Sequence, residues 1–572
     1  MRRRRVGIPI FQLEFATTAM LGVISDPTEE SAVREFFELF KIPWEFYRNE
    51  RQYQVVLCTG DAKPDPSSTR LLILYASQET EFDVRLKIET HLHDHETNLS
   101  LSAGSLPLYG CHATFLHRGT KVLSSENPGK TVGFVDRLED QLFARVGYDL
   151  FREVQCLVTR GQPPANAGTP TLELHIAFLR DLIVGCGIPL MEIPPVPEGY
   201  PFIVCLTHDV DHASIRRHKF DRTMFGFLYR ATLGSLFNVV RGRLPWRKMF
   251  TNWAAAAKLP FIYSGIAEDI WLQFDRYLEI EKGNPSTFFV LPFEGDPGRS
   301  SEGQAPWARA ARYDASHIAS KIPRLMSAGC EIGLHGIDAW LDSSKGREEA
   351  KRITRFSGKE TAGVRMHWLY WSEDSPVILE DGGFPYDSTV GYNDAIGYRA
   401  GTSQVYKPLQ ADRILELPLH VMDTALFYSN RLDLSPREAR KRVSSIVDNA
   451  ARLGGAVTIN WHDRSIAPER LWDDFYVELL NDLEARGAWF VTAAQAVSWF
   501  RKRRSAVFEE VRFDSGGLHV KVSTSSGDNL AGLRLRIHKP RGSKQFAECT
   551  DNQPNGYVDI SLNERIDALV AL

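Results

Sequence analysis

The sequence predicts a distorted (β/α) barrel flanked by an N-terminal α/β domain and a small C-terminal antiparallel β domain. The length of 572 residues suits about three domains. Between residues 197 and 505, short apolar runs end in polar residues and alternate with helical stretches. Such strands are typical of a parallel sheet that is covered on both faces. The pattern changes on either side, so we expect domains at 1–196, 197–505 and 506–572.

The N-terminal region mixes strand-like and helical patterns. Runs such as YQVVLC and TRLLILYA alternate with SAVREFFELFKI and TLELHIAFLRDLIVGCG, which predicts an α/β domain. The Pro-rich stretch at 188–201 is typical of a linker. Four Arg follow Met1, but Gln12 and Glu14 interrupt the apolar stretch behind them. We therefore do not expect a cleaved signal peptide.

In the central region, polar side chains follow the expected strands. FIVCL leads to Thr207 and His208, CEIGL leads to His335, and AVTINW leads to His462. In a barrel of this type the chemistry gathers at the C-terminal ends of the strands. We therefore expect these groups on one side of the barrel. After residue 506, alternating apolar and polar residues with Gly, Asp and Asn between them predict the antiparallel strands.

Composition limits the partners and the compartment. Sixty-eight basic and 72 acidic residues give a net charge of −4, which argues against a general nucleic-acid binder. Seven cysteines form no C-x-x-C pair, and several lie in apolar runs, which favours free thiols in a reducing compartment. We expect a cytoplasmic protein, for which peripheral membrane contact stays open. The sequence predicts no particular oligomeric state.

Four segments carry the candidate site residues. They are Asp209 and Asp211 in THDVDH, His335 and Asp338 in EIGLHGIDAW, Arg365 and His367 in GVRMHWLYW, and His462 and Asp463 in TINWHD. Unpaired charges are costly in a core, so acids at a strand end either reach the surface or share a cation. Catalytic zinc takes about three N or O ligands and keeps one position for water. A second carboxylate can accept the proton of that water. The set suits metal-assisted hydrolysis.

The order of these motifs resembles the polysaccharide deacetylase family (carbohydrate esterase family four). The resemblance rests on D-x-D after a strand, E-I-G-x-H, a strand ending in Arg and an apolar strand ending in W-H. FPYDSTVGY at 384–392 also resembles a segment of that family. The resemblance covers about half of the chain. It implies a distorted (β/α) barrel with a divalent metal, usually zinc, that hydrolyses N- or O-acetyl groups on sugars.

Carried over by position, the resemblance implies a role for each motif residue. It gives Asp209 as the base, Asp211 and His335 as metal ligands, Arg365 as the group that orients the base, and His462 as the acid.

The chain departs from the family pattern at the second metal-binding histidine. The family usually has this histidine four residues after the first, where this chain has Ala339. We favour His367 as the replacement, because it keeps two nitrogens and one oxygen on the metal. Asp338 is the alternative, and a degenerate, metal-free site stays open, with His208 or His212 as minor options.

We therefore expect a metal-dependent hydrolase that removes acetyl groups from N-acetylated sugars of a cell-surface glycan or its precursor. Its partner would be a glycan or glycolipid substrate. The alternatives are a hydrolase of a non-sugar amide and a non-catalytic glycan-binding protein on a decayed barrel. The metal content of the purified protein would separate these hypotheses.

Two further segments stand out. Residues 213–263, called here the basic aromatic segment, hold ten Lys or Arg, one acid and ten Phe, Tyr or Trp. Basic amphipathic helices with aromatic residues can lie on anionic membranes, so we consider peripheral membrane contact; a solvated insertion is the alternative. THLHDHE contains His91, His93 and His95 and is either a polar loop or a second metal site.

Overall fold

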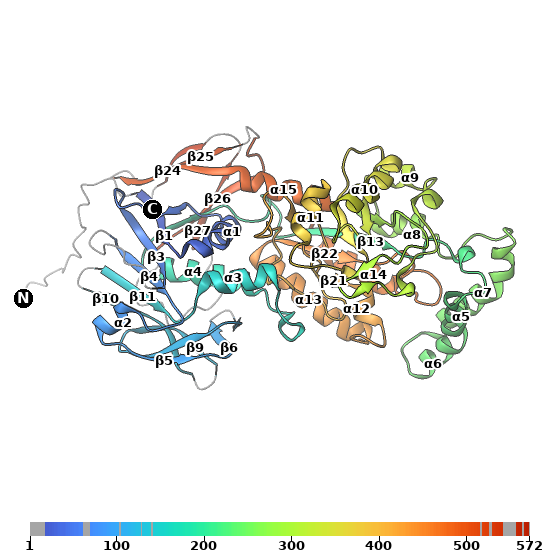
Figure 1. Cartoon of the computed structure of the whole chain (residues 1–572), viewed down its shortest axis with the longest axis horizontal. Helices are drawn as coiled ribbons and strands as arrows, with labels where there is room; N and C mark the ends of the chain where they lie inside the picture. The colour runs from blue at the N-terminus through green and yellow to red at the C-terminus, as the bar shows by residue number, and fades with distance from the viewer. Residues whose placement is uncertain are drawn as a thin grey trace, which may run out of the picture.

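A computed structural model describes residues 18–60, 69–101, 104–126, 129–138, 141–514, 517–525, 529–540, 556–562 and 566–570. Figure 1 shows an elongated molecule with a large mixed sheet at one end and a parallel sheet with helices around it in the middle. Three helices, labelled α5, α6 and α7, protrude at the opposite end. The expectation about a signal peptide falls on residues 1–17, which lie outside the described residues.

The central region forms one curled, parallel sheet, as predicted for a (β/α) barrel. The strand order is β20-β19-β18-β17-β14-β13-β22-β21, with β23 beside β13. Within 141–514 no ladder joins the end strands β20 and β21, so the barrel is open. The strands are β13 (Ile203–Val210), β14 (Ser286–Val290), β17 (Glu331–Gly336), β18 (Val364–Met366), β19 (Tyr386–Asp387), β20 (Leu415–Glu416), β21 (Val421–Met422), β22 (Ala456–Asn460) and β23 (Trp489–Phe490).

Helices cover this sheet because their apolar residues repeat on one face. Helix α13 is an example: Ser435 caps its first turn, Pro436 begins it, and Val443 and Ile446 on one face are buried. The strand β13 is buried along its whole length, so only its C-terminal end can present polar groups to the site. The helices are α8 (Phe274–Glu281), α9 (Ile322–Ser327), α10 (Ser343–Ser357), α11 (Ser375–Gly382), α12 (Asp423–Phe427), α13 (Pro436–Leu453), α14 (Asp473–Ala485) and α15 (Ala493–Ser505).

The C-terminal strands form antiparallel pairs, and they share sheets with N-terminal elements. The large sheet has the order β28-β25-β24-β1-β3-β4-β11-β10-β9-β6-β7, and β24 pairs with β1 through Thr18 and Arg512. Its strands β1, β3, β4 and β11 run parallel. The division into three domains stays a prediction. The bounds are β1 (Thr18–Ile24), β3 (Tyr53–Thr59), β4 (Leu71–Tyr75), β6 (Thr97–Leu101), β7 (Gly104–Leu108), β9 (Thr120–Ser125), β10 (Thr131–Leu138), β11 (Gln141–Val146), β24 (Ala506–Asp514), β25 (Gly517–Thr524) and β28 (Ile566–Val570).

The Pro-rich stretch at 188–201 is a packed connection and not a free linker. Its strand β12 (Leu190–Glu192) pairs with β26 (Leu533–His538), which also pairs with β27 (Tyr557–Leu562). Ile193 and Val196 are buried. The helices α1 (Glu30–Phe40), α3 (Leu150–Thr159) and α4 (Thr171–Gly185) complete this end of the molecule.

Two further observations concern the described residues only. None of the helices there is long and apolar enough to cross a membrane. The six cysteines that the structure describes are free thiols.

Candidate functional site

Three residues predicted as metal ligands lie together at the C-terminal ends of three strands. Asp211 follows β13, His335 lies near the end of β17, and His367 follows β18. The Nε2 atoms of His335 and His367 lie 3.3 and 3.5 Å from Oδ1 of Asp211. One ligand atom from each residue lies within 4.8 Å of the other two. These are the residue types that a divalent ion such as zinc binds.

The chemistry of the three groups fits a cation between them. Nδ1 of His335 lies 3.0 Å from the carbonyl oxygen of Arg365, so it carries the proton, and Nε2 turns a lone pair toward Asp211. Burial holds the pKa of His367 well below its usual value, so the His367 ring is neutral. Oδ1 of Asp211 is buried and has no well-formed hydrogen bond in the described residues. Converging lone pairs without donors are what a metal ion would satisfy.

Asp209 lies beside this group and is held on both carboxylate oxygens. Nη1 of Arg365 lies 3.0 Å from Oδ1, and Nδ2 of Asn460 donates to Oδ2 over 2.7 Å. Arg365 is fully buried, and it also donates to Thr207 and to the Ser388 carbonyl over 2.7 and 2.9 Å. The guanidinium is therefore fixed, and it fixes the Asp209 carboxylate in turn.

His462 faces the second carboxylate oxygen of Asp211 and is oriented by Asp423. Its Nδ1 lies 2.6 Å from Oδ1 of Asp423, and its backbone N–H donates to Oδ2 over 2.7 Å. Its Nε2 lies 3.7 Å from Oδ2 of Asp211. Burial alone lowers the pKa of His462, but the Asp423 carboxylate outweighs it and raises the pKa to about 10. The ring can therefore carry a proton into the site.

The alternatives to these residues have other partners. Asp338 accepts the Arg299 backbone N–H over 2.7 Å and lies outside the group that could hold a metal. His208 is buried between the Trp461 carbonyl and the Glu281 carboxylate, each 2.8 Å away. The site therefore gathers Asp209, Asp211, His335, Arg365, His367 and His462, and leaves Asp338 outside.

An exposed tryptophan follows His367 on a strained backbone. Trp368 and Leu369 have φ values of 63° and 54°, a region that non-glycine residues rarely adopt. The Trp368 side chain is 39% exposed, and its ring centroid lies 6.0 Å from that of His367. Arg309 holds the His367 carbonyl over 3.0 Å. Strain of this kind clusters at binding and catalytic sites.

Sequence reasoning missed or underrated three of these residues. Asn460 stands in TINWHD but was not singled out, and Ser388 stands in FPYDSTVGY. The sequence offers Asp423 as a group that could orient His462, and the structure places its carboxylate against the His462 ring. The position of Asn460 at a strand end, directly before Trp461 and His462, was the available signal.

A second group of imidazoles lies in the N-terminal region. One ring nitrogen each of His93, His95 and His112 lies within 4.8 Å of the other two. The rings of His93 and His112 stack with centroids 4.7 Å apart. Nδ1 of His112 is buried without a hydrogen bond in the described residues. The group contains no carboxylate that could serve as a base, so it does not replace the site on the central sheet.

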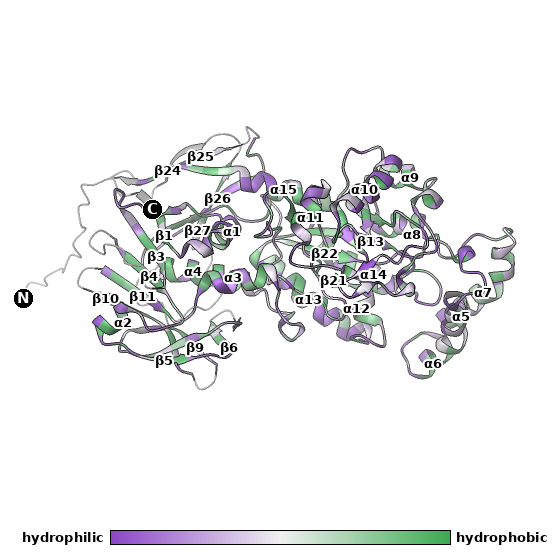
Figure 2. Cartoon of the chain, viewed as in Figure 1, coloured by the Kyte–Doolittle hydropathy of each residue, from purple (hydrophilic) through white to green (hydrophobic). Residues whose placement is uncertain are grey.

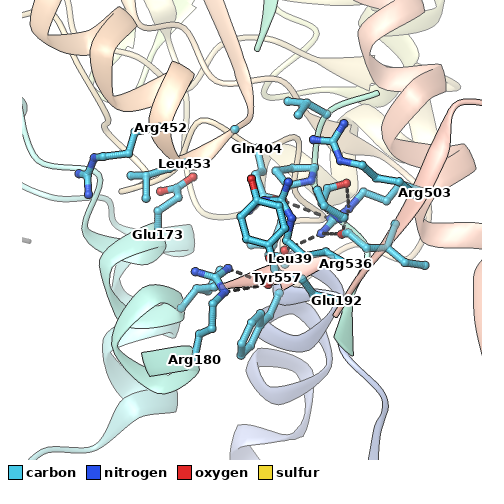
Figure 3. Close-up of a pocket in the computed structure, with 18 of the residues that line it drawn as sticks. Leu39, Glu173, Arg180, Glu192, Gln404, Arg452, Leu453, Arg503, Arg536 and Tyr557 are labelled. Carbon is cyan, nitrogen blue, oxygen red and sulfur yellow. Dashed lines mark hydrogen bonds and ion pairs between the residues drawn. The ribbon is translucent and has the colours of Figure 1, made fainter. Parts of the chain in front are cut away.

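A cavity of about 320 Å³ lies away from both groups, where N-terminal, central and C-terminal elements meet (Figure 3). Arg180 lies 2.8 Å from Glu192, and Arg536 lies 2.8 Å from Asp559. Arg503 donates to backbone carbonyls. Because these cations already have partners, we interpret the cavity as a polar junction between parts of the chain.

Several solved structures that resemble this chain are described as deacetylases or esterases. A protein from Mycobacterium smegmatis described as a polysaccharide deacetylase matches 54% of this chain and 95% of its own, at 18% identity and a TM-score of 0.34. Agd3, described as a novel carbohydrate deacetylase, matches 97% of this chain and 100% of its own, at 9% identity and a TM-score of 0.35. A family 4 acetyl xylan esterase from Clostridium thermocellum, in complex with a cobalt ion, matches 52% of this chain and 90% of its own, at 15% identity and a TM-score of 0.23.

The resemblance to polysaccharide deacetylases that the motifs indicated is thus also found among solved structures. No family model and no curated protein matches the chain.

Proposed function

We propose that this protein is a metal-dependent hydrolase that removes acetyl groups from N-acetylated sugars of a cell-surface glycan or its precursor. One observation carries the proposal. Asp211, His335 and His367 turn ligand atoms toward one point, and the oriented Asp209 and His462 flank it. A decayed barrel would not need to keep a base and an acid in place, so this arrangement argues against a purely binding protein.

The proposed metal ligands are Asp211, His335 and His367. A divalent ion held there, with zinc the expected one, would supply a bound water of lowered pKa and polarise the amide carbonyl. The residues fit such an ion because Oδ1 of Asp211 is buried without a well-formed hydrogen bond and two imidazole nitrogens face it.

Asp209 is the proposed general base. Its carboxylate accepts the proton of the attacking water, and Arg365 and Asn460 keep it in one orientation during this step. Both supporting side chains are buried, so the carboxylate does not need to reorganise when the proton arrives.

His462 is the proposed general acid. Asp423 accepts a hydrogen bond from Nδ1–H, so the proton on Nε2 faces the site and can pass to the amine nitrogen that leaves. The Asp423 carboxylate stabilises the imidazolium form of His462 until the proton is transferred. Asp209 and His462 would thus act on opposite sides of the acyl group.

The exposed ring of Trp368 is the proposed platform for the sugar. It stands next to His367 and presents an apolar face, on which the C–H face of a pyranose can pack. A cytoplasmic location is part of this proposal, supported by the six described cysteines that are free thiols.

Acetate release from N-acetylglucosamine oligomers tests the function. We expect the wild type to release acetate and Asp209→Asn to lose turnover by at least ~10² while it keeps its metal. An Asp209→Asn variant with wild-type turnover would contradict the assignment of the base. Release of acetyl groups from simple amides but from no N-acetylated sugar would support the non-sugar alternative.

A further inference from the structure

The basic aromatic segment, residues 213–263, folds into helices that project from the central sheet (Figure 1). These are α5 (Arg222–Tyr229), the π-helical turn η5 (Arg230–Gly234), α6 (Ser235–Val240) and α7 (Trp246–Tyr263). Their inner faces form a small core of their own with Met224, Phe227, Leu259, Ile262 and Trp271. One side of these helices is therefore buried in the small core, and the other side is exposed.

Helix α7 carries a row of exposed aromatic rings opposite its buried face. Trp246, Phe250, Trp253 and Phe261 follow one another at spacings of four, three and eight residues, which places them on one side of an α-helix. They are 60%, 50%, 40% and 55% exposed. The ring of Phe250 contacts those of Trp246 and Trp253, at centroid distances of 5.7 and 5.9 Å. These three rings therefore form one continuous exposed aromatic surface on α7.

The helices before α7 repeat the pattern. Phe225, Tyr229, Leu233, Phe237 and Val240 are all exposed at helical spacing, although other residues of the same helices are buried. Figure 2 shows hydrophobic and hydrophilic residues interspersed along these helices. Eleven of the 22 large apolar side chains that are exposed among the described residues lie in this one segment. Soluble proteins rarely gather so much exposed apolar surface unless it meets a partner.

Basic side chains border the apolar surface. Arg217, Arg230, Arg243 and Lys248 pair with acids outside the segment. The other six are exposed, and none of them has a carboxylate within 4.0 Å in the described residues. Arg216 donates to the Ala267 carbonyl, which leaves Lys219, Arg222, Arg241, Arg247 and Lys258 free to meet a partner. The segment has ten basic residues and one acid, a local charge of +9 in a chain of −4. The partner should therefore be apolar within and anionic at its surface.

We propose that the basic aromatic segment docks this protein on the surface of an anionic lipid bilayer, with the aromatic rings among the headgroups and the free cations on lipid phosphates. Tryptophan and other aromatic rings favour that interfacial layer, and each nearby Lys or Arg adds attraction to anionic lipid. A second copy of the chain fits less well, because an isologous contact would place the same positive surface against itself.

The segment is tied to the mouth of the candidate active site. It begins two residues after Asp211, and it is bonded to the loop after His462. Arg230 pairs with Glu469 over 2.8 Å, and the Glu469 backbone N–H donates to Asn252 over 2.7 Å. Docking would therefore hold the site close to the lipid surface. If the proposed function also holds, the substrate is a glycan carried on a lipid.

Vesicle flotation tests the docking without using activity. The full chain should float with vesicles of phosphatidylcholine and phosphatidylglycerol at low salt, and much less at high salt, because salt screens exposed charges. Trp246→Ser/Phe250→Ser/Trp253→Ser should weaken binding at least ~10-fold. Arg222→Glu/Arg247→Glu/Lys258→Glu should weaken it ~10²-fold or more, and should remove the preference for phosphatidylglycerol.

The double variant Leu92→Ser/Leu116→Ser is the matched control. It removes two large apolar side chains of the N-terminal region that are 59% and 62% exposed. This variant should bind vesicles as the wild type does. The charge variant alters exposed side chains only, so it keeps the test valid if the aromatic variant misfolds. Failure of the wild type to float would overturn the proposal, as would self-association through the segment without vesicle binding. Neither result would bear on acetate release.

Discussion

The contact between Asp423 and His462 leads to a specific prediction, because the Asp423 carboxylate accepts two hydrogen bonds from His462. Oδ1 faces Nδ1 of His462 at 2.6 Å, and Oδ2 accepts the His462 backbone N–H at 2.7 Å. The amide of an Asp423→Asn variant has a single acceptor oxygen. It must either lose the ring contact or set its NH₂ group against the backbone N–H.

The size of the effect follows from the bond that is lost. A hydrogen bond to a charged group contributes about 1.5–3 kcal/mol. At about 1.36 kcal/mol per tenfold change in rate, Asp423→Asn should lower turnover ~10- to ~150-fold. The loss should apply to N-acetylated sugars, whose leaving amine needs a proton, because Asp423 acts through His462.

Turnover on two substrates is the assay. With 4-nitrophenyl acetate, whose leaving group departs without a proton, the loss should shrink to a few-fold. In an His462→Ala background, Asp423→Asn should have little further effect, since the pair acts as a unit. Equal losses on both substrates, or loss of the metal from Asp423→Asn, would refute the assignment of Asp423 as the residue that positions the acid.

Two further predictions concern other parts of the molecule. Trp368→Ala should raise KM for N-acetylated oligosaccharides about tenfold with a small change in kcat, because the ring binds sugar without touching the amide. A change in kcat alone would contradict the proposal that Trp368 is a sugar-binding platform. Arg145→Met should lower the free energy of unfolding by about 3–5 kcal/mol in chemical denaturation. The reason is that it leaves the fully buried carboxylate of Asp83, 2.9 Å away, without its cation. A change below about 1 kcal/mol would contradict a stabilising role for this ion pair.

The strand ends were predictable from the sequence because polar residues follow apolar runs there. That pattern placed Asp211, His335 and His367 at one edge of a parallel sheet, and the structure brings their ligand atoms together. The family pattern alone would have put a ligand at residue 339, where an alanine stands. Only the sheet order, with β18 beside β17, shows that His367 reaches the point where the missing histidine would act.

Contacts between distant residues were not predictable in the same way. Asn460 holds Asp209 across 251 residues, because β22 lies beside β13, and neighbours in a sheet cannot be read from the order of strands in the chain. The alternating pattern after residue 506 predicted antiparallel strands, but not that Arg512 would pair with Thr18. The positive φ of Trp368 had no sequence signal, since tryptophan rarely adopts it.

Metal content in matched variants tests the central claim most directly. Elemental analysis would measure the equivalents of metal in the purified wild type and in three variants. The variants are His335→Ala, His367→Ala and Asp338→Ala. The account predicts that the first two each lose one equivalent and that Asp338→Ala loses none, because Asp338 faces Arg299 and lies outside the group. Loss of metal from Asp338→Ala with retention in His367→Ala, or full retention in all three, would contradict it.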